Sequence, residues 1–394
     1  MHLIKKFSLT ILILLLLLAI SAAIAYFNRQ DAMVYLSAIW VGVCTTIIVK
    51  TSKPKLRLAA LYVGIGILAF GISEAYFTGW LFKSQKKSLV FTVSDPTYFQ
   101  PHSLLGVSPK KSSQIRAQKT YKDEPLYNVQ YTITSNGVRN DANIASDSAP
   151  AVLFYGGSFT FGEGVEDGET LPNQFEKKTQ GQLKAFNFGF HGYGPHQMLV
   201  SLENELEKPI IGKHPPRYLV YQAISDHINR CAGTKFWDQS GPKYILDENG
   251  EAIYQGPFQH WLIGRGISLL ARSVMVRKWF AANSSPTLQD AELFTSIVSK
   301  AASIFKDRYG GEFYMIIWPG EMPLYRSSIA KLEASHINII PVETILPDAD
   351  TNIEKYRIHP NFERHPNALA YEKIAEYLAA LLSQQMVKVE NNLK

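Results

Sequence analysis

The distribution of apolar residues divides the chain into an N-terminal part and a longer C-terminal part. Three apolar runs lie at about 7–27, 32–49 and 58–82, and Glu74 is the one charged residue within them. Each run is long enough to cross the hydrocarbon core of a bilayer as a helix. Three successive helices that are apolar all round are not expected of a soluble core. The pattern therefore predicts a membrane anchor with three transmembrane helices over residues 1–82.

The charges beside these runs predict the orientation of the anchor. The linker 50–57 carries four positive charges, whereas residues 28–31 carry one charge of each sign. The positive-inside rule therefore places the linker in the cytoplasm and residues from about 83 onward outside it, which in a bacterium is the periplasmic or extracellular side of the inner membrane. The first run is also compatible with a cleaved signal peptide. Glu74 is expected at the outer interface of its span.

Beyond residue 150 short apolar strands alternate with amphipathic helices. This alternation predicts a parallel sheet covered by helices on both faces, in a domain at about 151–385 that is followed by a polar tail at 386–394. The predicted strands lie at 151–155, 184–188, 217–223, 312–318 and 337–342, and the predicted helices near 170–179, 195–207, 288–308, 323–334 and 367–384.

Residues 83–150 precede this domain and show a different pattern. They are predicted to form a linker and a small β region, in which 127–134 alternates as a strand and 110–122 is an exposed basic loop.

A second departure from the alternation is an insertion at about 232–285. Within it, 243–255 is typical of a hairpin and 261–280 of a basic, aromatic helix. We expect this helix to cap the site or pack on the domain, and contact with anionic lipid is the alternative.

Composition narrows the possible functions. The formal net charge is +6, but the first 90 residues hold ten of the 40 Lys and Arg and two of the 34 Asp and Glu, so the remainder is slightly acidic. A slightly acidic domain argues against nucleic acid as a partner. The two distant cysteines, Cys44 and Cys231, argue against a disulfide and against a cysteine zinc site. No motif indicates a metal, a nucleotide or a redox cofactor.

The stretch 151–162 carries the strongest chemical signal. An apolar strand ends in Gly156 and Gly157 and delivers Ser158 into a tight turn. Such a turn exposes a hydroxyl to a base and leaves backbone N–H groups free to receive an oxyanion. Ser158 is therefore the candidate nucleophile, although Thr160 rules out the G-x-S-x-G pattern of α/β-hydrolases.

The candidate base is His365, on a loop that leads into the last predicted helix. Asn367 is a candidate cap of that helix. Glu363 can accept a hydrogen bond from the imidazole and hold its tautomer. His359 also precedes a Pro-Asn pair and stays the alternative base.

At this point the chain resembles the SGNH/GDSL hydrolases, in which the serine comes early and an acid–histidine pair comes late. The resemblance covers about 151–385 and implies a three-layer, flavodoxin-like domain. It nominates the Gly192 N–H for the oxyanion hole beside the Ser158 N–H. In the third block Asp226 matches the family's aspartate, while Ser225 stands where the oxyanion asparagine belongs. Ser225 or Asn229 is then the candidate side-chain donor.

Two further positions differ from the family pattern. Gly157 replaces the aspartate before the serine, and Glu363 replaces the aspartate before the histidine.

The resemblance implies a serine esterase that acts on O-acyl or O-acetyl esters of glycans or lipids. The predicted anchor adds that the enzyme is held in the membrane and that its substrate belongs to the cell envelope. Two alternatives stay open. One is an O-acyltransferase that modifies a surface polysaccharide, which would require a membrane partner as acyl donor. The other is a binding or scaffold protein with a decayed site.

Overall fold

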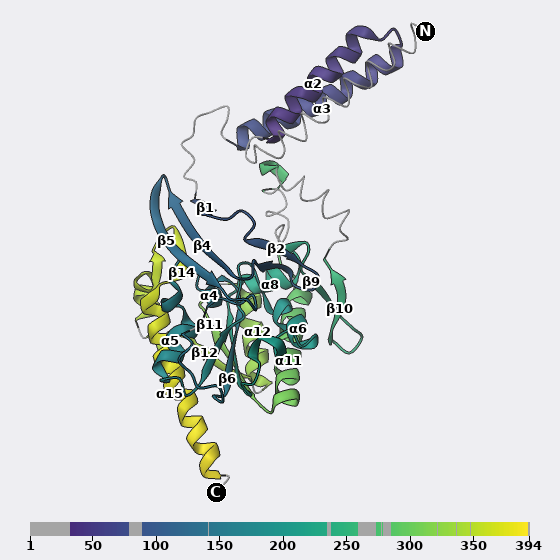
Figure 1. Ribbon diagram of the computed structural model, residues 1–394. Coiled ribbons are helices and arrows are strands. Elements are labelled where there is room, and N and C mark those ends of the chain that lie inside the picture. Colours follow the sequence, from purple (N-terminus) through teal and green to yellow (C-terminus); the bar gives the residue numbers. More distant parts are fainter. Residues whose placement is uncertain are drawn as a thin grey trace. The chain divides into compact units, whose positions relative to one another are not determined.

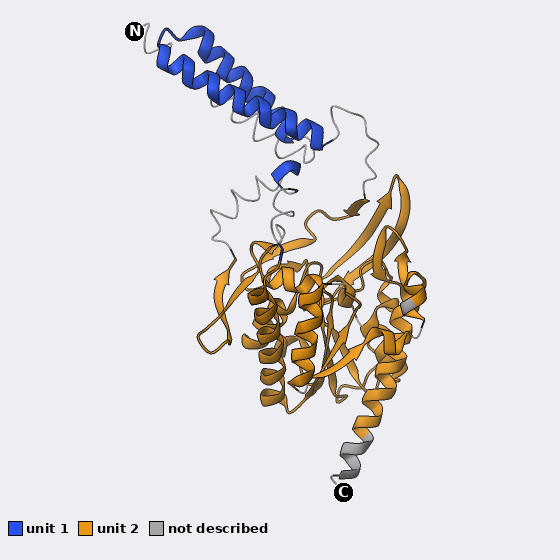
Figure 2. Ribbon diagram, turned by 180° about the vertical axis from the view of Figure 1, so that it is seen from behind, with its two compact units in different colours: residues 1–86, 262–285 blue, residues 87–261, 286–394 orange. Residues whose placement is uncertain are grey.

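The computed structural model describes residues 32–78, 89–140, 142–234, 238–258, 273–276, 278, 285–320, 322–335, 337–346 and 348–392. The chain divides into two units, one of residues 1–86 with 262–285 and one of residues 87–261 with 286–394 (Figure 2). The predicted span at 7–27 and most of the predicted helix at 261–280 lie outside the described residues.

Two long apolar helices, α2 (Ala32–Lys50) and α3 (Pro54–Phe77), pack side by side in the first unit (Figure 1). Small residues allow this close packing, because a Cβ on Gly71 would lie 2.6 Å from the Cβ of Ser37. Helix α3 begins earlier than predicted, since proline suits the first turn of a helix. By length and composition both helices are able to cross a membrane.

Glu74 has a defined structural role in this unit. Its side chain is fully buried, and its carboxylate accepts hydrogen bonds from the Ser273 hydroxyl and from the N–H groups of Val274 and Met275, at 3.0 and 2.9 Å. A carboxylate at this position caps the first turn of a helix, here the helical segment 274–276. Glu74 is thus the cap of a short helical segment in this unit.

A five-stranded parallel sheet forms the centre of the second unit. In space its strands follow the order β12-β11-β8-β6-β7, which in chain order is 2-1-3-4-5, the doubly wound order of flavodoxin-like folds. The strands are β6 (Ala151–Gly156), β7 (Lys184–Asn187), β8 (Pro216–Ala223), β11 (Glu312–Ile317) and β12 (Asn338–Pro341). The predicted α/β class with a central parallel sheet is confirmed.

Helices cover both faces of this sheet (Figure 1). Phe154 points to the face packed by α5 and α15, and the next residue, Tyr155, points to the face packed by α6, α11 and α12. The helices are α5 (Leu171–Lys178), α6 (Pro195–Glu203), α7 (Lys208–Ile211), α11 (Leu288–Tyr309), α12 (Pro323–Ala334), α13 (Val342–Ile345), α14 (Ala349–Asn352) and α15 (Ala368–Asn392). The predicted hairpin in the insertion is the ladder of β9 (Pro242–Leu246) and β10 (Ala252–Pro257).

The β region contains an antiparallel sheet of β1 (Leu89–Val93), β4 (Ser113–Tyr121) and β5 (Glu124–Ile133), and a pair of β2 (Phe99–His102) and β3 (Gly106–Pro109). The predicted exposed loop at 110–122 is wrong, because most of it is strand β4. Its Ile115 and Ala117 alternate with polar residues and are buried, while the backbone pairs with β5. The basic residues between them masked this alternation in the sequence.

Arg139 connects the β region to the turn that carries Ser158. Its guanidinium is buried and donates to Asp167 at 2.9 Å and to the backbone carbonyls of Phe161 and Val165 at 2.9 and 2.7 Å. The guanidinium also stacks on the Tyr131 ring, 4.4 Å from its centroid. This charged side chain thus helps to hold the β region against the sheet.

We predict that Arg139→Met lowers the free energy of unfolding by about 3–5 kcal/mol, because it leaves Asp167 and several carbonyl groups without their partner. The matched control is Arg116→Met. Arg116 is exposed on β4, so we expect its replacement to change stability by no more than about 0.5 kcal/mol. Urea unfolding of both variants measures the difference, and equal effects would contradict the role of Arg139.

Candidate active site

Ser158 lies directly after β6, at the first position of the short helix α4 (Ser158–Phe161). Gly156 has φ +151°, and a Cβ there would lie 2.3 Å from Thr160 Oγ1. The backbone can therefore make this turn only with glycine. The first N–H groups of a helix have no intrahelical acceptor, so the Ser158 N–H is free to bind an oxyanion.

Position 157 requires glycine for a steric reason. A Cβ at this position would lie 2.6 Å from Arg230 Nη1 and 2.8 Å from the Tyr193 carbonyl oxygen. The Arg230 guanidinium donates to that same carbonyl at 2.7 Å and to Asp226 at 3.1 Å. Arg230 thus fills the space beside the serine, and no side chain fits at 157.

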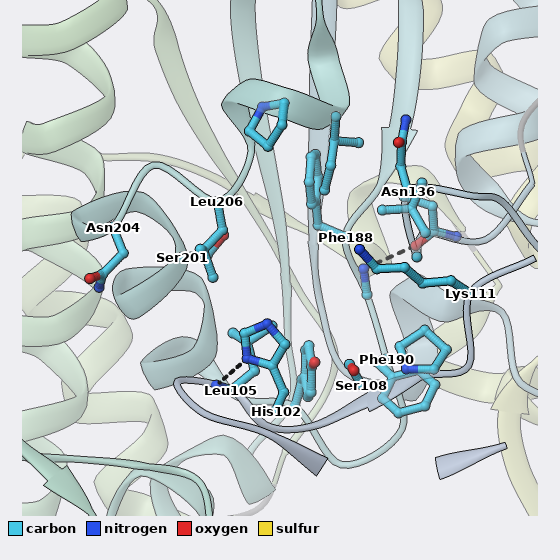
Figure 3. A pocket seen from close by; sticks show the side chains of 18 of the residues that line it. His102, Leu105, Ser108, Lys111, Asn136, Phe188, Phe190, Ser201, Asn204 and Leu206 are labelled. Atoms are coloured by element: carbon cyan, nitrogen blue, oxygen red, sulfur yellow. Dashed lines mark hydrogen bonds between the residues drawn. The ribbon is translucent and has the colours of Figure 1, made fainter. Parts of the chain in front are cut away.

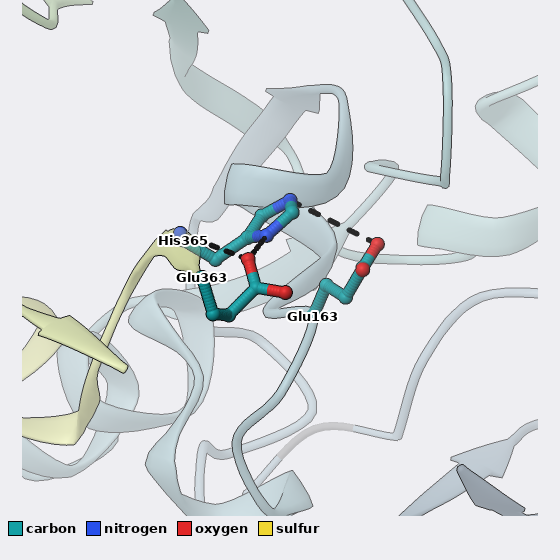
Figure 4. A group of neighbouring side chains, drawn as sticks. All are labelled: Glu163, Glu363 and His365. Atoms are coloured by element: carbon teal, nitrogen blue, oxygen red, sulfur yellow. Dashed lines mark hydrogen bonds and ion pairs between the residues drawn. The ribbon is translucent and has the colours of Figure 1, made fainter. Parts of the chain in front are cut away.

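The structure brings Ser158, His365 and Glu363 together. The Ser158 hydroxyl lies 2.7 Å from His365 Nε2, and the other ring nitrogen, Nδ1, is hydrogen-bonded to Glu363 Oε1 (Figure 4). The same carboxylate oxygen accepts from the His365 backbone N–H at 3.2 Å. A hydroxyl, an imidazole and a buried carboxylate in this order form the arrangement of a serine nucleophile with its base and an orienting acid.

A short ladder of β13 (Arg357–His359) and β14 (Glu363–Pro366) positions the base, where the sequence predicted a loop. Asn367 then caps α15 by accepting from the Ala370 N–H at 3.0 Å. His359 points elsewhere: its Nδ1 accepts from the N–H groups of Asn361 and Phe362, and its ring stacks on Phe362. His365 is therefore the histidine that the fold brings to Ser158.

The other predicted site residues follow the ends of β7 and β8. Gly192 lies in the loop after β7 with φ +79°, a conformation that favours glycine. Ser225 follows β8 and lines a cavity. Asp226 pairs with Arg230, and the Asn229 amide donates to Asp226 at 3.3 Å. Asp226 and Asn229 thus stabilise the start of α8 (Asp226–Cys231).

Sequence reasoning missed a second carboxylate at the base. Glu163 is buried, and its Oε2 lies 3.8 Å from His365 Nε2 and 2.7 Å from His191 Nδ1 (Figure 4). Lys119 of β4 lies 3.4 Å from Glu163 and forms an ion pair with Glu363 as well. The position of Glu163 in the sequence, just beyond the turn that carries Ser158, was a signal that it lies near the site. Lys119 gave no such signal, because it is distant from that turn in the sequence.

These charges hold both carboxylates ionised. Burial by itself raises the pKa of Glu363, but the hydrogen bond and charge of His365 and the charge of Lys119 outweigh it and lower that pKa. Burial likewise opposes ionisation of Glu163, yet the charge of His365, the hydrogen bond from His191 and Lys119 bring its pKa well below the usual range.

Glu163, Glu363 and His365 also form a group of metal-ligand type, with their ligand atoms within 4.8 Å of one another. Lys119 already supplies a positive charge to both carboxylates, and both His365 nitrogens have protein partners. The possible metal-ligand atoms of this group thus already have partners within the protein.

Two cavities lie near these elements. One of about 780 Å³ is at the carboxyl ends of β8 and β11, where ligands bind in doubly wound folds, and Ser225 is in its wall. The other, of about 440 Å³, is lined by Phe188 and Phe190 and by His102 and Lys111 of the β region (Figure 3).

Comparisons with known proteins give structural neighbours only. No family model and no curated protein matches the chain. Solved structures that it resembles include a protein assigned to the lipolytic G-D-S-L family from Desulfitobacterium hafniense DCB-2, with 12% identity over 58% of this chain and 98% of that one, at a TM-score of 0.36. A protein assigned as an arylesterase from Agrobacterium tumefaciens str. C58 has 16% identity, coverage of 60% and 99%, and a TM-score of 0.31.

A carbohydrate esterase, whose active site is described as having divergent catalytic and non-catalytic binding functions, has 11% identity over 76% of this chain and 98% of that one, at a TM-score of 0.35. The chain is thus similar to esterases and lipolytic hydrolases. At these scores the roles of individual residues rest on the geometry of the site.

We predict that Lys119→Met lowers kcat by roughly tenfold to a hundredfold, because Glu363 loses its second partner and His365 its fixed position. The depressed pKa of Glu363 stabilises the fold above pH 4.5, its ordinary value, and this contribution is lost as the pH falls through the lower folded-state value. The Lys119→Met variant lacks part of this stabilising contribution. Wild type and variant should therefore differ in thermal stability at pH 7 and converge below about pH 4.5.

The control for this experiment is Lys122→Met, which removes an exposed charge from the same hairpin. Thermal unfolding and ester hydrolysis are measured from pH 3 to pH 8 for both variants. An effect of Lys119→Met on stability that is the same at every pH would contradict the proposed link to Glu363.

Proposed function

We propose that the chain is a serine ester hydrolase that works through an acyl-serine intermediate. One observation carries this proposal: Ser158 Oγ lies 2.7 Å from His365 Nε2, while Glu363 holds the opposite nitrogen of the same ring. Hydrogen-bond reach between nucleophile and base, with a third group orienting the base, is the geometric requirement for an activated serine.

In the proposed mechanism His365 Nε2 takes the proton of Ser158 as the hydroxyl oxygen attacks the ester carbonyl. The backbone N–H groups of Ser158 and Gly192, with the Ser225 hydroxyl, donate to the tetrahedral oxyanion. The imidazolium then protonates the leaving alcohol oxygen as the C–O bond breaks. Water, deprotonated by His365, attacks the acyl-serine and releases the acid and free Ser158.

Two ionised carboxylates assist the proton transfers. Glu363 orients the imidazole and stabilises the imidazolium that forms in each step. The negative charge of Glu163, 3.8 Å from Nε2, acts on the same cation from the other side. The charge of Lys119 lowers both pKa values independently of His365, which favours the ionised carboxylates while His365 exchanges its proton.

We further propose that the N-terminal unit anchors the enzyme in the inner membrane and that the hydrolase domain lies outside the cytoplasm. Helices α2 and α3 have 19 and 24 residues. Many large apolar side chains of α3 are exposed, Val63 and Ile65 at 55% each, which suits a lipid environment. The positive linker after α2 supports the orientation. An acylated glycan or lipid of the cell envelope is then the accessible substrate.

The same intermediate permits transfer to a second hydroxyl in place of water. An O-acyltransferase of this kind would draw its acyl group from a membrane partner. Hydrolysis and transfer differ only in the group that attacks the acyl-serine, so analysis of the products decides between them.

We predict that a fluorophosphonate probe labels the wild type and that Ser158→Ala abolishes labelling and lowers kcat for p-nitrophenyl acetate by about 10³-fold or more. His365→Ala should reduce both to a similar extent, because the two residues act as a unit. The matched control is Ser327→Ala, which removes an exposed hydroxyl.

Mass spectrometry of the products, with an oligosaccharide acceptor present, separates free acid from transferred acyl group. Labelling that persists in Ser158→Ala would contradict the assignment of the nucleophile. Absence of labelling in the wild type would favour a binding or scaffold protein.

A further inference from the structure

The 780 Å³ cavity is lined by several charged residues that have no part in the proposed mechanism. It lies beside the catalytic residues, because Ser225 and Trp318 are in its wall, the Trp318 ring packs on Phe159, and Phe159 packs on His365. Its volume falls in the range of small-ligand sites, about 300–1,000 Å³. A substrate whose carbonyl oxygen occupies the proposed oxyanion hole would extend its alcohol part into this cavity.

Three arginines line the cavity: Arg326 from α12, Arg357 from β13 and Arg364 from β14. Arg326 is held by a hydrogen bond to the Gly320 carbonyl at 3.3 Å. Within the described part of the chain, neither Arg357 nor Arg364 forms an ion pair with an acidic side chain. Burial and the neighbouring charge of Arg364 lower the pKa of Arg357, while Glu354 acts in the opposite direction.

Two guanidinium groups that lie together without a direct ion pair favour binding of an anion between them. The guanidinium fork matches a carboxylate or a phosphate with two parallel hydrogen bonds. The cavity therefore offers two guanidinium groups that form no ion pair with an acidic side chain among the described residues.

The negatively charged residues in the lining indicate which anion fits. Glu333 and Glu343 also line the cavity, and carboxylates accept hydrogen bonds from sugar hydroxyls. The wall combines these charged side chains with apolar ones such as Trp318 and Ile329, a mixture that suits a sugar ring with polar substituents. A ligand with one acidic group and several hydroxyls matches these groups better than a phospholipid.

We propose that this cavity, the arginine cavity, binds the carboxylate of an acidic sugar, so that the enzyme acts on O-acylated acidic glycans in preference to neutral ones. This inference rests on the proposed ester hydrolase function and specifies the substrate class of that site. Arg357 and Arg364 are then residues that determine specificity through the alcohol part of the substrate.

The test compares acetylated oligogalacturonides with acetylated xylo-oligosaccharides, using full-length protein in detergent. Arg357→Gln and Arg364→Gln are each expected to lower the ratio of kcat/KM for the acidic over the neutral substrate by roughly tenfold or more, as loss of a charge-assisted hydrogen bond predicts. The loss should appear in KM. Arg357→Lys keeps the charge without the fork and should retain part of the preference.

The matched control is Lys213→Gln, which removes an exposed positive charge before the amino end of β8, opposite the catalytic edge of the sheet. We expect it to leave the substrate ratio unchanged. The wild type could hydrolyse p-nitrophenyl acetate and yet show no preference for the acidic substrate. That result would overturn the proposed role of the arginine cavity and leave the hydrolase function intact.

A binding measurement separates the inference from catalysis. Calorimetry with unacetylated oligogalacturonide and the Ser158→Ala variant should detect binding that Arg357→Gln weakens roughly tenfold. If glycerol phosphate binds in the same assay, Arg357→Gln weakens that binding and the oligogalacturonide does not bind, the acidic glycan is wrong and a phospholipid headgroup takes its place. If the sugar binds while the wild type is not labelled by fluorophosphonate, the cavity stands and the hydrolase function fails.

Discussion

Two buried carboxylates, Glu163 and Glu363, approach His365 from the sides of its two ring nitrogens, and one lysine, Lys119, contacts both of them. Removing charges from water is costly unless each finds a partner, so these side chains depend on one another for their ionised state. The network needs β4, the turn after β6 and the β13–β14 ladder to lie in place at once. Catalytic geometry in this molecule is therefore a property of the assembled second unit.

The small β region is part of the active site for the same reason. Lys119 comes from β4, and Tyr127 of β5 donates its hydroxyl to Glu163 at 3.2 Å. Phe161 and Phe190 from the catalytic loops pack in one cluster with the β region's Tyr131. Arg139 completes the junction through the carbonyls of the nucleophile turn. A β region that packs and pairs in this way supports the loops that carry Ser158 and His365.

Neighbouring side chains shape two positions beside the candidate site. Next to Ser158, Arg230 occupies the space that a side chain at position 157 would need, and it pairs with Asp226. After β8, Ser225 lies in the wall of the arginine cavity. Both positions therefore depend on contacts between β8, α8 and the turn after β6.

Local patterning in the sequence was enough to predict the α/β class, the five strands of the parallel sheet and most helices, because their apolar periodicity is strong. It also placed Ser158, Glu363 and His365 at the carboxyl edge of the sheet, since chain order and the glycines of the turn are local information. It failed at β4, where basic residues hid a short alternation of buried Ile115 and Ala117. Only the tertiary structure brought Lys119 and Glu163 to His365 and set Arg357 beside Arg364. Those contacts join segments that lie far apart in the chain, so no local pattern predicts them. The pKa values of these charged groups depend on their burial, which is also a property of the tertiary structure.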